Sequence, residues 1–389
     1  MQINQLDYDI ALKIKNRQLY LSETEVKSPT CESMPLSLTI SDTTRCNLNC
    51  IMCHRTRNFF DKGPKPFLKR FPLTRDLVKL YAHHRNKTLM DFELFEKICR
   101  ETFPYLFSLT LSIAGEPFMN PHFIKELELI ENYKVKLVIF TNATLLPKGK
   151  TLLSLLNNLS TLIVSFDGAT KRTYERIRKG ADFKAVLSNI KRFNSHQDSL
   201  DNDRKPRLVF WLTLMRSNIE ELPEFIKLAH NLKADAIGLC HMIVFNERMR
   251  SESLIYHKEL ANRYLIESRD LIDKYGLDTY DFPPLFSNKS ESITKDVSSL
   301  SEPICRFLWS SSFIELNGDV FPCCAPNRRG LLMGNVAKQT FKEIWNGQCY
   351  QKLRESFKKG DLFVSCQNCY QRLKDNISDI DSIYFPIFS

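Results

Sequence analysis

Three cysteines, Cys46, Cys50 and Cys53, lie in one short stretch directly after a run of apolar and β-branched side chains. Three closely spaced thiolates suit an iron–sulfur cluster, whose usual complement is four cysteines, so one iron would keep an open coordination position. On a catalytic metal, an open position is where a substrate or cofactor binds. The alternative is a structural zinc ion with a fourth ligand such as His54. The spacing favours the cluster.

A second set of cysteines lies toward the carboxyl end and comprises Cys305, Cys323, Cys366 and Cys369. Two distant cysteines and a Cys-x-x-Cys pair can bind either tetrahedral zinc or an iron–sulfur cluster, and spacing alone leaves both open. No secretory signal and no membrane-spanning apolar run is evident, so we expect a cytoplasmic protein that does not enter a membrane. In that reducing compartment cysteines favour metal binding or catalysis over disulfides.

The elements that must position these cysteines follow a βα pattern from Leu36 to about Val244, which predicts a parallel sheet flanked by helices. The predicted strands are Leu36–Ser41, Phe107–Ile113, Val135–Thr141, Leu162–Ser165, Leu208–Leu214 and Ala236–Val244. The predicted helices are Phe92–Thr102, Pro121–Asn132, Leu145–Leu159, Phe183–Asn194 and Ile219–Leu232. Ser217 and Glu220 have the spacing of a capping box before the last helix, as do Thr340 and Glu343 further on. The first cysteine loop follows a strand end, where parallel-sheet enzymes place their chemistry.

The chain divides into four predicted regions. Residues 1–35 form an extension, and residues 36–245 form the βα domain with a basic insert at 57–87. Residues 246–301 form a helical linker with a Pro/Ser-rich end, and residues 302–389 form a small cysteine-rich domain. The net charge of +10 and the basic insert could attract phosphate or nucleic acid. A charged loop is more often simply solvated.

The C-x3-C-x2-C motif resembles the signature of the radical S-adenosylmethionine (SAM) enzymes, in which three cysteines hold a [4Fe–4S] cluster and SAM chelates the fourth iron. Segments at successive strand ends resemble further motifs of that family, with alanine at 114 and 143 where glycine is usual. The resemblance implies that the segment 114–117 contacts the SAM amino group, through a carboxylate or a free carbonyl, and that Arg178 pairs with the SAM carboxylate. The implied SAM contacts are Met52, Ala114, Gly115, Glu116, Pro117, Thr141, Asn142, Ser165, Asp167 and Arg178.

The second cysteine set, with its C-x12-G-x4-C spacing and closing Cys-x-x-Cys, resembles the carboxy-terminal extension of the SPASM and twitch subfamilies. No cysteine follows Cys369, so the count fits the shorter twitch form with one auxiliary [4Fe–4S] cluster. The spacing is similar to that of the butirosin-pathway aminocyclitol dehydrogenase. The resemblance therefore implies an α/β fold, a partial (β/α)6 TIM-like radical SAM barrel with a small carboxy-terminal twitch (SPASM-like) domain.

The function implied by the resemblance is cleavage of SAM to a 5′-deoxyadenosyl radical that removes a hydrogen atom from carbon. Two [4Fe–4S] clusters, SAM and an external one-electron reductant of the flavodoxin or ferredoxin type would be needed. We expect a small polar substrate, such as a sugar or aminocyclitol, because the roughly 35 residues before the first predicted strand are too few for a leader-binding domain. The expected reaction is two-electron oxidation, with electron transfer to the auxiliary cluster.

Several alternatives stay open at this point. A radical epimerase would use a cysteine as hydrogen donor, for which Cys240 on the sixth strand is the candidate. Cys324, next to a cluster ligand, could replace that ligand or stay free. A peptide maturase would act only with a partner peptide, and an RNA-modifying or zinc-binding nucleic-acid protein would retain RNA in a salt-sensitive way. No RNA-binding signature is evident, so we expect no nucleic-acid partner. The oligomeric state is not legible from the sequence.

Overall fold

The structure, a computed structural model, describes residues 5–53, 88–244, 247–286, 305–323, 328–367 and 369. The predicted basic insert at 57–87, the alternative zinc ligand His54 and the candidate Cys324 lie outside the described residues.

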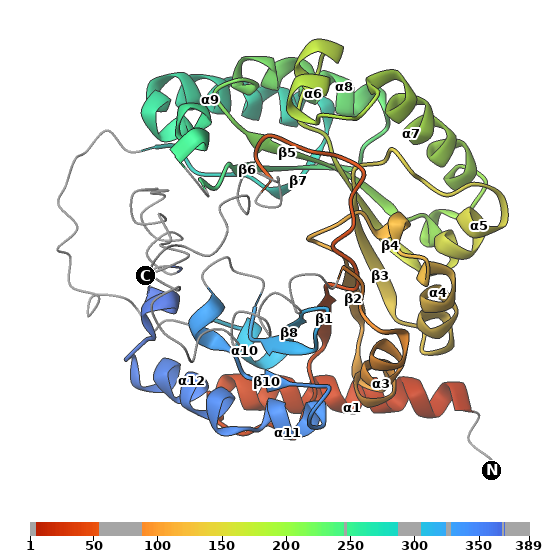
Figure 1. The fold of residues 1–389 in the computed structure, drawn as a ribbon, viewed down its shortest axis with the longest axis vertical. Helices are drawn as coiled ribbons and strands as arrows, with labels where there is room; N and C mark the ends of the chain where they lie inside the picture. Colours follow the sequence, from red (N-terminus) through yellow and green to blue (C-terminus); the bar gives the residue numbers. More distant parts are fainter. Residues whose placement is uncertain are drawn as a thin grey trace, which may run out of the picture.

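Within the described residues, ten strands form one sheet in the order β10-β9-β8-β1-β2-β3-β4-β5-β6-β7. Strands β1 to β7 are successive parallel neighbours, and the sheet curves into an incomplete barrel (Figure 1). The barrel strands are β1 (Ser37–Ile40), β2 (Ser108–Leu111), β3 (Lys136–Thr141), β4 (Leu159–Ser165), β5 (Arg207–Leu214), β6 (Ala236–His241) and β7 (Asp278–Asp281).

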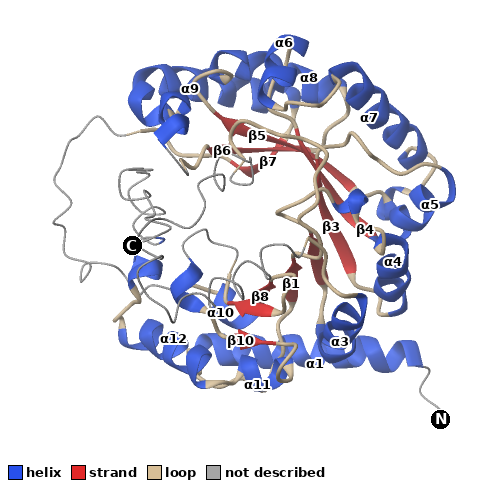
Figure 2. Cartoon of the chain, in the orientation of Figure 1, coloured by secondary structure: helices blue, strands red, loops and turns tan. Residues whose placement is uncertain are grey.

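Helices cover the outer face of this sheet (Figure 2). They are α3 (Phe92–Thr102), α4 (Phe123–Asn132), α5 (Gly149–Asn158), α6 (Lys171–Ile177), α7 (Phe183–Gln197), α8 (Leu222–Asn231) and α9 (Lys258–Tyr275). Alternate strand residues that belong to the main core, such as Leu109, Leu137 and Leu162, are fully buried. Side chains alternate between the two faces of a strand, so this face packs on helices and the other faces the barrel interior.

The six predicted barrel strands and their parallel order are confirmed, but the sheet has a seventh parallel strand. The predicted helical linker, residues 246–301, contains a long helix, α9, as expected, but the edge strand β7 that follows this helix was not predicted. The short strand Asp-Thr-Tyr-Asp is exposed at every position, so no buried period marks it in the sequence.

The capping box predicted at Ser217 and Glu220 is wrong. The Ser217 N–H donates instead to the Glu252 carboxylate at 3.0 Å, and Glu220 pairs with Arg216 at 2.7 Å. A 3-10 turn, Ile219–Glu221, therefore precedes α8. The second predicted capping box, Thr340 with Glu343, is confirmed.

The cysteine-rich region continues the barrel sheet. Strand β8 pairs in parallel with β1, with Ser311 opposite Ser37, and β9 and β10 follow antiparallel. Its elements are α10 (Phe307–Ser310), β8 (Ser311–Ile314), β9 (Asp319–Phe321), β10 (Gly334–Asn335), α11 (Phe341–Trp345) and α12 (Gln348–Lys359). The extension forms α1 (Gln5–Glu25), which lies on the same side of the molecule as α10 to α12 (Figure 1). Among the described helices, none has the length and apolarity to cross a membrane.

Candidate active site

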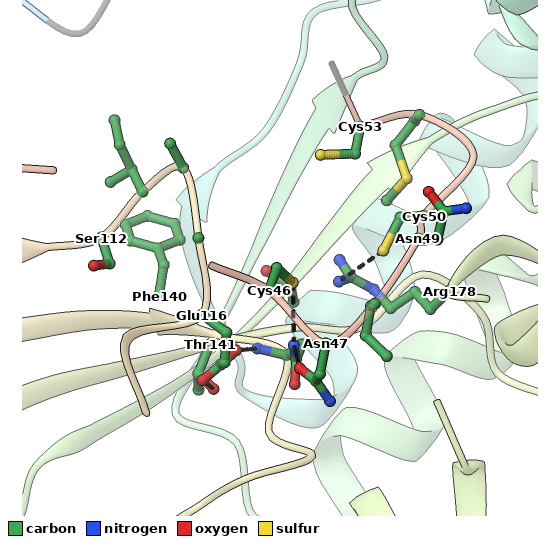
Figure 3. A pocket seen from close by; sticks show the side chains of 17 residues that line it. Cys46, Asn47, Asn49, Cys50, Cys53, Ser112, Glu116, Phe140, Thr141 and Arg178 are labelled. Carbon is green, nitrogen blue, oxygen red and sulfur yellow. Dashed lines mark hydrogen bonds between the residues drawn. The ribbon is translucent and has the colours of Figure 1, made fainter. Parts of the chain in front are cut away.

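A cavity of about 570 Å³ lies where β1 to β4 end, and the three cysteines of the first motif line it (Figure 3). Of the predicted SAM contacts, all but Pro117 and Asp167 also line it: Met52, Ala114, Gly115, Glu116, Thr141, Asn142, Ser165 and Arg178. The fold thus brings together residues from positions 46 to 178. Carboxyl ends of neighbouring parallel strands meet at one edge of a sheet, which explains the convergence.

The backbone of the segment 176–180, which follows α6, holds the cysteine loop. The Asn49 N–H donates to the Lys179 carbonyl at 2.9 Å, and the Ile51 N–H donates to the Ile177 carbonyl at 3.0 Å. Gly180 has a φ of +99°, a left-handed conformation that glycine adopts at little cost, and it faces Leu48. This segment therefore shapes the loop that carries the thiols through its backbone.

Position 115 needs a glycine because there is no room for a side chain there, and not because of its backbone angles. A methyl group at this position would lie 2.6 Å from the Thr43 carbonyl oxygen and 2.8 Å from that of Arg45. The neighbouring Glu116 N–H donates to the same Arg45 carbonyl at 2.7 Å. The second strand end is thus pressed directly against the start of the cysteine loop.

The Glu116 carboxylate is committed to the third strand end. Its two oxygens accept from the Thr141 hydroxyl at 2.7 Å and from the Asn142 N–H at 2.8 Å. Burial raises the pKa of Glu116 to about 7, while these two hydrogen bonds act in the opposite direction. The carboxylate, which lines the cavity, therefore orders the turn formed by residues 141–143.

Asn142 connects that turn to the cysteine loop. Its amide nitrogen donates to the Asn47 side chain at 3.1 Å and approaches the Cys46 sulfur at 3.8 Å. Its oxygen accepts from Thr144. Ala143, which follows, is buried with a φ of +57°, so alanine here occupies the left-handed region that glycine would favour.

Arg178 lies between a cysteine and an aspartate. One guanidinium nitrogen is 2.6 Å from the Asp167 carboxylate and another is 3.9 Å from the Cys50 sulfur. Burial raises the pKa of Asp167, and Arg178 opposes that shift. Asp167 is fully buried and also accepts from the Thr213 N–H at 2.7 Å, so it orients Arg178 from behind the cavity wall.

Several cavity residues were missed from the sequence, among them Asn47, Ser112 and Phe140. Asn47 lies inside the cysteine motif, so the motif itself could have pointed to it. Phe140 lies near the end of β3, two residues before Asn142, so its place at a strand end could have pointed to it. Ser112 donates to the buried Asp42 carboxylate, a partner that no sequence pattern reveals.

The three thiols supply the donor set of an iron–sulfur cluster with an open iron. They line one cavity, and the charges of Cys46 and Cys53 each raise the pKa of Cys50, although no three Cys, His, Asp or Glu side chains of the described residues are placed as a ready metal site. Burial is the larger cause and raises that pKa to about 11. A cationic iron–sulfur core would offset the cost of burying thiolates here.

Cys240, the candidate hydrogen donor, lies on the opposite strand face from His241. Its sulfur accepts from the Trp211 indole N–H at 3.2 Å, and burial raises its pKa to about 11. The Trp211 ring also contacts Phe140 of the cavity wall, with ring centroids 5.8 Å apart. His241 packs on Phe286 instead, and burial lowers its pKa to about 4.

The second cysteine set comes from three separate segments of the carboxy-terminal region. Cys305 precedes α10, Cys323 follows β9, and Cys366 and Cys369 follow α12. Burial raises the pKa of Cys366 to about 12, and the charges of the other three thiols add to that shift. Four thiols that interact in this way suit a four-cysteine metal or cluster site.

These features define a class of protein: a partial α/β barrel with a three-cysteine site at its strand ends and a four-cysteine domain continuing its sheet. Comparison with known families agrees. The radical SAM superfamily model matches residues 40–229, and an iron–sulfur cluster-binding domain, SPASM, matches residues 305–370. The chain belongs to the radical SAM superfamily and carries a SPASM-type domain. Its cofactors are accordingly SAM, a [4Fe–4S] cluster and auxiliary iron–sulfur chemistry.

Relatives and solved structures share this architecture. A Pyrococcus furiosus protein named tungsten-containing aldehyde ferredoxin oxidoreductase cofactor-modifying protein is 23% identical over 348 residues, spanning 85% of this chain and 86% of its own. Streptococcus suis SuiB bound to SAM superposes with a TM-score of 0.59 at 18% identity, covering 87% of this chain and 72% of that one. The structure of anSMEcpe with bound SAM gives 0.58 at 16% identity, covering 88% and 89%. At these identities the structures show the fold alone.

Proposed function

We propose that this protein is a radical SAM oxidoreductase that oxidises a carbon centre of a small polar substrate, such as a sugar or aminocyclitol. The observation that carries the proposal is the single cavity lined by three cysteines and eight predicted SAM contacts. A four-thiol site on a domain continuous with the barrel sheet supports the oxidative outcome.

In this proposal Cys46, Cys50 and Cys53 bind the first cluster, and SAM occupies the remaining space of the cavity. Arg178, oriented by Asp167, faces the SAM carboxylate, and Glu116 holds the Thr141–Asn142 turn that forms one wall. When bound, the reduced cluster and SAM supply a carbon radical that removes one substrate hydrogen atom. The chain positions the substrate and excludes water.

The overall reaction balances for a secondary alcohol. The carbon-bound hydrogen leaves as an atom and ends on 5′-deoxyadenosine, and methionine is the other product of SAM. The hydroxyl hydrogen leaves as a proton, and one electron leaves the substrate to give the ketone. The reductant supplies one electron, and we propose that the site of Cys305, Cys323, Cys366 and Cys369 receives one.

The first test is the iron, sulfide and zinc content of anaerobically reconstituted protein, for wild type and the Cys46→Ala, Cys50→Ala, Cys53→Ala triple variant. We expect about eight irons falling to about four in the variant. About four irons with one zinc would remove the electron acceptor and count against dehydrogenation. No iron in either protein would overturn the enzyme proposal.

A radical epimerase is the second candidate, and Cys240 is the observation that favours it. Its thiol is held by Trp211 beside the cavity wall, and its raised pKa keeps the S–H intact at neutral pH. Epimerisation in D₂O would place solvent deuterium on the product carbon, and Cys240→Ala would abolish that product while SAM cleavage continues. Oxidation would yield a two-hydrogen mass loss that is insensitive to Cys240→Ala.

The substrate class has its own test, since SuiB and anSMEcpe also have structures with peptides bound. The Pyrococcus relative is named for modifying a cofactor, which leaves a small molecule as our first candidate. SAM cleavage should rise with pools of sugars and cyclitols and stay at background with peptides. A response to peptides alone would replace the small-molecule proposal with a peptide maturase.

A further inference from the structure

The segment between α1 and β1 is bound through its backbone by side chains of the SPASM-type domain. Cys31 is bound at both its N–H and its carbonyl by the Asn346 side chain, each at 2.7 Å. Three more side chains donate to carbonyls of this segment: Trp309 to Ser28 at 2.8 Å, Arg354 to Pro29 at 3.2 Å and Trp345 to Ser33 at 2.8 Å. The amino-terminal extension is therefore part of the cluster domain's framework.

Arg354 is the centre of this framework. It is fully buried on α12, and its guanidinium lies 4.4 Å from the Trp345 ring centroid and 4.9 Å from that of Tyr350. It donates to three carbonyls that are distant in sequence, those of Pro29, Trp345 and Leu308. Leu308 lies in the turn that begins at Cys305, because its N–H donates to the Cys305 carbonyl at 3.3 Å.

Tyr350 forms a second connection, to the segment that ends at Cys323. Its hydroxyl bonds with the Ser312 hydroxyl at 2.9 Å and approaches the Phe321 carbonyl at 3.4 Å. Phe321 is only two residues before Cys323.

Burying a guanidinium is costly, and a well-packed apolar side chain would often stabilise a core as well or better. What arginine offers is a rigid fork that fixes several acceptors at once. Here the acceptors belong to the extension, to the turn after Cys305 and to α11. Partners one step removed from a metal commonly orient its ligands in this way.

We propose that Arg354 and Tyr350 are positioning residues for the four-cysteine site, holding the segments of Cys305 and Cys323 against the 28–33 backbone. The proposal rests on the proposed function only in assigning iron to that site. The extension, which carries no motif, thereby acquires a role in placing the auxiliary site relative to the barrel.

The test uses the full-length Cys46→Ala, Cys50→Ala, Cys53→Ala protein, in which metal reports only the second site. In that background we compare Arg354→Met, Arg354→Lys and Tyr350→Phe, with Lys358→Met on the exposed face of the same helix as the matched control. Iron, sulfide and zinc per chain, the electron paramagnetic resonance spectrum after reduction, and the apparent metal affinity against a chelator are measured. Circular dichroism reports folding.

We expect Arg354→Met to weaken metal retention about tenfold or more, as outer partners of a metal site do. Arg354→Lys should recover little, because an ammonium cannot span three carbonyls. Tyr350→Phe keeps the ring and should alter the spectrum with a smaller loss. Lys358→Met should match its parent.

Full metal content and an unchanged spectrum in both Arg354→Lys and Tyr350→Phe would overturn the proposal. If Arg354→Met fails to fold, the two conservative variants decide the matter. Zinc in the parent protein would contradict the proposed electron acceptor but not the positioning role, since loss of zinc in the variants reads out the same four thiols. The two proposals therefore fail in distinguishable ways.

Discussion

Gly115→Ala should dislocate the cysteine loop, although it adds a single methyl group. That methyl would lie 2.6 Å from the Thr43 carbonyl oxygen, whereas ordinary contact begins at 3.4 Å, so the two strand ends must separate by about 0.8 Å (3.4 minus 2.6). Overpacking of this kind costs about 1–3 kcal/mol. Weakening the bond from the Glu116 N–H to the Arg45 carbonyl adds about 1 kcal/mol. We expect a total loss of about 2–4 kcal/mol.

The assay is urea-induced unfolding of the metal-free protein, together with iron content and SAM affinity of the reconstituted protein. Ala114→Gly is the matched control, one residue away in the same turn, and should change stability by no more than about 1 kcal/mol. Because the displaced backbone leads directly to Cys46, Gly115→Ala should also lower SAM affinity. If Gly115→Ala unfolds within about 0.5 kcal/mol of wild type and binds SAM normally, the steric argument is refuted.

Three further predictions concern residues in or beside the same cavity. The pKa of Glu116 is raised to about 7 in the folded chain, so the free energy of unfolding should fall by about 3 kcal/mol as pH rises from about 4.5 to 7. Glu116→Gln should flatten that pH dependence when unfolding is measured at successive pH values. Arg178→Met should cost about 3–5 kcal/mol in urea unfolding because it strands the buried Asp167 carboxylate, and the double variant with Asp167→Asn should recover part of that loss. Ala143→Gly should change the free energy of unfolding by less than about 1 kcal/mol. Relief of backbone strain at a φ of +57° offsets the loss of a buried methyl group and the greater flexibility of the unfolded chain. Thermal unfolding would show a larger shift if either contribution dominated.

The sequence predicts the barrel well because burial leaves a period in it. Strands such as Leu208–Leu214 combine apolar and β-branched residues, and all six predicted strands occur in the structure. The sequence did not predict β7, because this edge strand is exposed at every position and has no apolar face that would leave a period in the sequence. The capping box at Ser217 failed because the Ser217 N–H donates to the Glu252 carboxylate, a partner 35 residues away that local spacing does not reveal.

The sequence predicted which loops meet at the candidate site, but not which atoms are in contact there. Spacing and resemblance placed three cysteines and eight other residues around one cavity. They assigned Glu116 and Asp167 to SAM, which stays a prediction, and they did not reveal the partners within the chain that both carboxylates bind. Those partners are supplied by other strand ends, so only three-dimensional proximity identifies them.

These internal pairings have a consequence for binding. A site that must hold SAM and an oxygen-sensitive cluster gains from being rigid before either arrives, because ordering after binding would reduce affinity. Glu116 fixes the third strand end, Asp167 fixes Arg178, and Asn142 joins its turn to the cysteine loop. Each carboxylate thus orients a neighbouring group of the cavity, whether or not it also contacts the ligand. Removing either acid is therefore expected to disorder the neighbouring strand end or Arg178, in addition to any ligand contact that is lost.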